Sequence, residues 1–92
     1  MTNTLEEFYD GVEKIIKKLR QFGFHKWSQT LESDMVAGVM AGEILSLLRQ
    51  DLIRLLRSPL SLLLNIREEL TQAIAFTNKM LTKNQFDNKN TR

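Results

Sequence analysis

The stretch LIRLLRSPLSLLLNIREEL, residues 52–70, decides the fold because it places ten Leu and Ile side chains around the chain's single proline. A helix that spans a membrane would need about 20 mostly apolar residues with few charges. Four charged side chains interrupt the run between residues 44 and 64, and each is costly at the centre of a bilayer: Arg49, Asp51, Arg54 and Arg57. We therefore predict that the stretch faces a protein core or a partner and does not span a membrane.

The residues on either side of the proline have the periodicity of amphipathic helices. Residues 41–57 carry apolar side chains on one side of a helical wheel and polar ones on the other. Ser58 is a favoured N-cap, and Pro59 is tolerated in the first turn of a helix but not in its interior. We therefore predict one helix over 41–57 and another over 59–83.

The N-terminal segment has both the start and the stop signals of a helix. Thr4 and Glu7 have the spacing of a capping box. Apolar residues then recur at helical intervals until Gly23, a residue type that commonly ends helices. These signals predict a helix over 4–22.

A shorter helix is predicted over 24–36, with Trp27 and Leu31 on its apolar face. Two glycines lower the helix propensity of the segment that follows, so residues 36–43 could form either a loop or a helical turn. No strand-like alternation is present. The predicted fold class is all-α, a compact four-helix antiparallel bundle in a single domain over 1–83, followed by a disordered polar tail over 84–92.

Composition and charge narrow the classes of function. The chain has 92 residues and no cysteine, which excludes disulfides and thiolate metal sites. A formal net charge of +2 is weak evidence for a polyanionic partner. The acidic N-terminus lacks the basic start and apolar run of a secretion signal. We expect a cytoplasmic protein without a cofactor.

No group of residues indicates catalysis or a metal site. His25 is the only histidine, and none of the five serines stands in a nucleophile motif. A metal site built from His25, Glu32 and Asp34 lacks a second histidine. Neighbouring carboxylates on a helix point about 100° apart, so they are typical of solvated faces. We predict that the protein is not an enzyme.

Nucleic-acid binding is a weaker interpretation. The helix over 41–57 offers leucines where a recognition helix needs polar side chains that read bases. Arg54, Arg57 and Arg67 could still contact phosphates if they came together. The alternative function is therefore a small nucleic-acid-binding or regulatory helical protein that acts as a homo-oligomer.

Apolar residues remain outside the predicted core faces. The helix over 59–83 places Leu63 on its core face, but it has further apolar residues, Leu64 among them, off that face. Either a central helix is covered on two sides, or these residues form an exposed patch for a protein partner or a second copy. The predicted contact residues are five apolar anchors with a polar rim: Leu47, Ile53, Leu62, Phe76 and Met80, with Glu43, Asp51, Arg54 and Arg57.

The order of the predicted helices, with Gly23, Trp27 and Leu31 in a Gly-x-x-x-Trp-x-x-x-Leu spacing, resembles the small all-helical immunity proteins that bacteria keep beside secreted or contact-dependent toxins. The resemblance covers most of residues 5–82. It implies a cytosolic, non-enzymatic protein that binds one toxin domain and blocks its active site or its activation. It carries over no binding residue, because these families vary most where they bind.

The charge of the chain departs from part of that family. Immunity proteins to nuclease toxins are usually acidic, to complement a basic target, whereas this chain is mildly basic. A nuclease target is expected only if acidic residues cluster on one face. The candidates lie in or beside the second and third predicted helices: Glu32, Asp34, Glu43 and Asp51.

Overall fold

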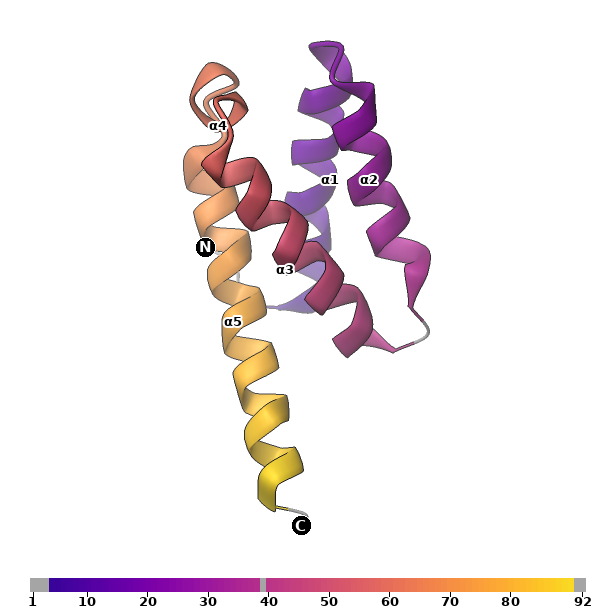
Figure 1. Cartoon of the computed structure of the whole chain (residues 1–92), viewed down its shortest axis with the longest axis vertical. Coiled ribbons are helices and arrows are strands. Elements are labelled where there is room, and N and C mark those ends of the chain that lie inside the picture. The colour runs from indigo at the N-terminus through magenta and orange to yellow at the C-terminus, as the bar shows by residue number, and fades with distance from the viewer. Residues whose placement is uncertain (1–3, 39, 91–92) are drawn as a thin grey trace.

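The structure, a computed structural model, describes residues 4–38 and 40–90, with side chains described up to residue 82. Within these residues the chain forms helices and no strands, so the predicted all-α class is confirmed. The closer description, an antiparallel four-helix bundle, stays a prediction. Five helices follow one another (Figure 1): α1 (Leu5–Gln21), α2 (His25–Ala37), α3 (Ala41–Arg57), α4 (Leu60–Leu63) and α5 (Arg67–Asn90).

The core lies between the four longer helices. α1 packs against α2 and α5, and α3 packs against the same two helices. Figure 1 shows α3 crossing obliquely in front of α1, and α5 reaching past the other helices toward the C-terminus. The rings of Phe8 and Phe76 stack with their centroids 5.1 Å apart and join α1 to α5. None of the helices in the described part of the chain is both long and apolar enough to cross a membrane.

The predicted start and stop of the first helix are confirmed. The hydroxyl of Thr4 accepts a hydrogen bond from the backbone N–H of Glu7 at 3.1 Å, and the Glu7 carboxylate accepts one from the N–H of Thr4 at 3.2 Å. Gly23 has φ +88°, a conformation that favours glycine because it has no Cβ. The chain turns there and begins α2 two residues later.

The sequence predicts one helix over 59–83, but the structure has two helices in this segment, α4 and α5. Ser58 caps the first, since its hydroxyl accepts a hydrogen bond from the N–H of the first residue of α4 at 3.3 Å. α4 nevertheless ends at Leu63, after about one turn. Asn65 has φ +55°, which asparagine tolerates better than most residues, and the chain turns there toward α5.

This turn changes which leucines are buried. Leu63, predicted on the core face, is 72% exposed, whereas Leu64, predicted off that face, is 5% exposed. The periodicity of one continuous helix does not apply across residues 64–66, because the helix axis changes direction there. The prediction for both leucines is therefore wrong for the same geometric reason.

The C-terminal helix is longer than the sequence indicates. Residues 84–92 were predicted to form a disordered tail, but α5 continues to Asn90, and residues 91–92 lie outside the described part of the chain. No glycine or proline follows Pro59 in the sequence, so neither of the usual helix-stopping residues is present.

Two glycines should respond in opposite ways to alanine. A Cβ on Gly38 would lie 2.6 Å from the Cβ of Glu43, so Gly38→Ala must shift the backbone between α2 and α3. We expect it to lower the free energy of unfolding by about 1–3 kcal/mol. Gly11 lies inside α1 with nothing within 4 Å of an added Cβ, so Gly11→Ala should raise that free energy by about 1 kcal/mol. Urea denaturation of both variants tests this, and changes of the same sign would contradict it.

Candidate functional site

The five apolar residues predicted to contact a partner divide between surface and core. Phe76 is 6% exposed and stacks on an aromatic ring of α1, so its predicted role as an exposed anchor is wrong. Ile53 and Met80 are partly buried and pack against the core. Leu47 is 37% exposed and Leu62 is 71% exposed. Only the two leucines are therefore open to a partner over much of their surface.

α4 carries two of the large hydrophobic residues that are exposed in the described part of the chain; the others are Phe22, Val36, Met40 and Leu47. Leu62 and Leu63 are neighbours and are 71% and 72% exposed. Leu62 lines a shallow pocket together with Arg57 and Arg67, which are both exposed. Neither arginine forms an ion pair with any residue that the structure describes. We call these four residues the α4 tip; Leu63 is the member that sequence reasoning placed in the core.

The residues of the predicted polar rim do not form one surface. Asp51 and Arg54 are paired, with 3.0 Å between a carboxylate oxygen and a guanidinium nitrogen. The Arg54 guanidinium also lies 5.6 Å from the centre of the Trp27 ring on α2. Glu43 stands near the start of α3, where its carboxylate accepts a hydrogen bond from a backbone N–H at 3.3 Å. Glu43 lies about 21 Å from Arg57 along the axis of α3.

A buried carboxyl group of α2, that of Asp34, lies at the contact with α3. Asp34 is 8% exposed, and its Oδ2 atom is buried without a hydrogen-bond partner among the described residues. Burial, followed by hydrogen bonding and charge repulsion from Asp51, raises the pKa of Asp34 from 3.8 to about 7. A protonated Asp34 can donate its O–H to the Asp51 carboxylate, and a neutral carboxyl group costs less to bury than a charged one. The sequence identified both acids as candidates but could not show that they lie together.

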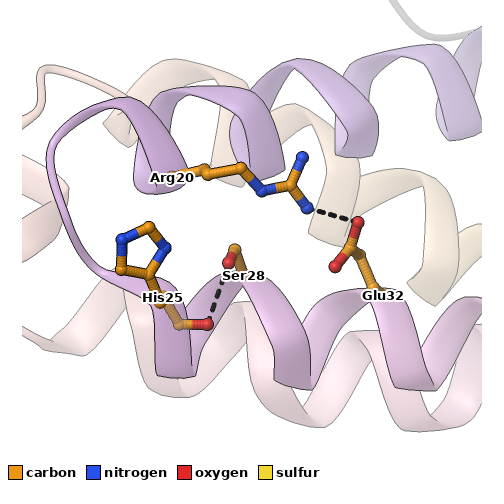
Figure 2. A network of polar contacts seen from close by, with 4 residues as sticks. All are labelled: Arg20, His25, Ser28 and Glu32. Carbon is orange, nitrogen blue, oxygen red and sulfur yellow. Dashed lines mark hydrogen bonds and ion pairs between the residues drawn. The ribbon is translucent and has the colours of Figure 1, made fainter.

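The acidic candidates do not create a free acidic face. Glu32 forms an ion pair with Arg20 of α1, which Figure 2 shows bridging the two helices. Asp51 is paired with Arg54, and Asp34 is buried. Glu32, Asp34 and Asp51 therefore do not form the acidic cluster that binding to a basic nuclease domain would require.

His25 takes part in a backbone hydrogen bond at the start of α2. Ser28 donates its hydroxyl hydrogen to the backbone carbonyl of His25 at 2.9 Å, as Figure 2 shows, and not to the imidazole ring. This bond lies in the first turn of α2 and satisfies a polar group there. Among the described residues, no group of three or more His, Asp or Glu side chains is placed to hold a metal ion.

No protein-family model, no curated protein and no solved structure matches this chain. The resemblance to immunity proteins therefore rests on the order of the helices and the spacing of three residues, and it stays a prediction.

Proposed function

We propose that this chain is a non-enzymatic protein-binding module that docks through the α4 tip. The observation that supports the proposal is the pair of neighbouring leucines, 71% and 72% exposed, of which Leu62 lines a pocket with two arginines that form no ion pair with the described residues. Apolar anchors surrounded by polar groups are typical of the centre of a protein–protein interface. Nothing in the fold of α4 requires leucine at these two positions, since neither side chain is packed in the core.

The partner that fits this surface has an apolar pocket edged by carboxylates. Arg57 and Arg67 leave two positive charges open beside Leu62, and charge complementarity favours acidic groups opposite them. A second copy of the chain fits less well. A twofold contact between two α4 tips would place the arginines of one copy near those of the other, and like charges repel.

The most concrete version of this function is toxin immunity in the bacterial cytoplasm, which follows from the resemblance in the sequence. The α4 tip then points to a toxin domain with an acidic contact surface. The α4 tip does not favour a basic nuclease domain, because its exposed charges are positive.

The test is capture by a tagged chain, with Leu62→Ser/Leu63→Ser as the variant and Leu47→Ser on α3 as the control. We expect the double variant to lower recovery of one stoichiometric protein at least about tenfold, because it removes the central anchors. The control should leave recovery unchanged. Arg57→Glu/Arg67→Glu should also weaken recovery, and added salt should weaken capture by the unsubstituted chain.

Three outcomes would overturn the proposal. Equal recovery by the double variant and the control would show that the α4 tip is not the contact. Loss of the captured material after nuclease treatment would favour the nucleic-acid alternative. Binding to vesicles of anionic phospholipid, without a protein partner, would assign the leucines and arginines to a membrane surface instead.

A further inference from the structure

α2 is attached to the rest of the protein by little apolar surface. Leu31 is its only large hydrophobic residue that is fully buried, while Trp27 and Met35 are partly buried. α1, with 17 residues against 13 in α2, buries five hydrophobic residues. α2 packs against α1 and α3, so its polar contacts with these two helices contribute to its attachment.

The charged groups at these contacts are few. Toward α1, Glu32 pairs with Arg20 at the surface, where both side chains are 48% exposed. Toward α3, Asp34 meets Asp51, whose side chain is 13% exposed and is paired with Arg54. One positive charge therefore stands beside two carboxyl groups on the α3 side.

We infer that Asp34, which is buried between α2 and α3, holds a proton in the folded protein, and that loss of this proton loosens α2 from α3. With the proton bound, the Asp34 O–H donates a hydrogen bond to the Asp51 carboxylate, and Arg54 balances the single negative charge. When the proton leaves to solvent, the hydrogen bond is replaced by repulsion between two carboxylates, one of them buried. Arg54 can balance only one of them.

The proton leaves Asp34 close to neutral pH. The pKa of Asp34 is raised to about 7, so small changes around neutral pH change how much of the protein holds the proton. The pair involves none of the residues of the α4 tip. The inference therefore goes beyond the proposed function, and either one can fail without the other.

The chain contains a built-in probe, because its single tryptophan, Trp27, lies on α2 with Arg54 over its ring. We expect its fluorescence emission to move to longer wavelength as pH rises from about 5 to about 9, with a midpoint near the titration of the pair. Asp34→Asn cannot ionise and should abolish the transition. Glu13→Gln, which removes an exposed acid from α1, should leave the midpoint unchanged.

Two further measurements test whether Asp34 is the group whose titration causes the transition. Because histidines titrate in the same range, His25→Gln must retain the transition; its loss in that variant would overturn the inference. Carboxyl ¹³C NMR of the unsubstituted chain should show Asp34 titrating near pH 7. Titration of that carboxyl below about pH 5 would overturn it even if Asp34→Asn failed to fold.

Discussion

Asp34→Asn should raise the free energy of unfolding at neutral and higher pH and should flatten its dependence on pH. The pKa of Asp34 is raised from 3.8 to about 7 in the folded protein, mainly by burial and then by Asp51. Between these two values the folded state holds a proton that the unfolded state has lost. The free energy of unfolding therefore falls by about 1.4 kcal/mol per pH unit across this window.

The sign follows from the direction of the shift. The stability linked to this proton is fully present below about pH 4 and is lost as pH rises through about 7. Asparagine cannot ionise, and its amide can donate to Asp51. We therefore expect the variant to be more stable than the unsubstituted chain by roughly 2–4 kcal/mol above pH 7, and nearly equal to it in acid.

Urea denaturation at a series of pH values measures this effect. Glu13→Gln is the control, because it removes an exposed acid from α1 and should keep the slope of the unsubstituted chain. Stability that rises from pH 4 to pH 7 in the unsubstituted chain, after correction for the control, would contradict the buried proton on Asp34.

Phe76→Ala should lower the free energy of unfolding by about 3–5 kcal/mol, whereas Leu62→Ala should change it by less than about 0.5 kcal/mol. Phe76 is 6% exposed and stacks on Phe8 between α1 and α5, so its loss leaves a cavity between two helices. Leu62 is 71% exposed and leaves no cavity.

Thermal unfolding followed by circular dichroism separates the two cases, since 1 kcal/mol moves the midpoint of a domain of this size by about 4–8 °C. A large loss from Leu62→Ala together with a small one from Phe76→Ala would reverse the assignment of core and surface. Both residues have the same status in the sequence, as apolar residues off the predicted core face, so this pair of variants tests what the structure adds.

Signals that act over a few residues were sufficient for much of the fold. The capping box at Thr4 and Glu7, the stop at Gly23 and the cap at Ser58 each depend on hydrogen bonds or backbone angles within one turn. The all-α class follows from apolar periodicity, and the charged residues within the apolar run exclude a spanning helix. The same periodicity identified the exposed Leu62 as a contact residue.

The turn at Asn65 and the pairing of Asp34 with Asp51 depended on the tertiary structure. An asparagine with positive φ leaves no mark in the apolar pattern when the residues on both sides, Leu64 and Ile66, are buried. The two acids lie on different helices, and only the packing of α2 on α3 removes Asp34 from water and raises its pKa. Periodicity shows which side of a helix is apolar, but the neighbouring helices decide whether that side is covered.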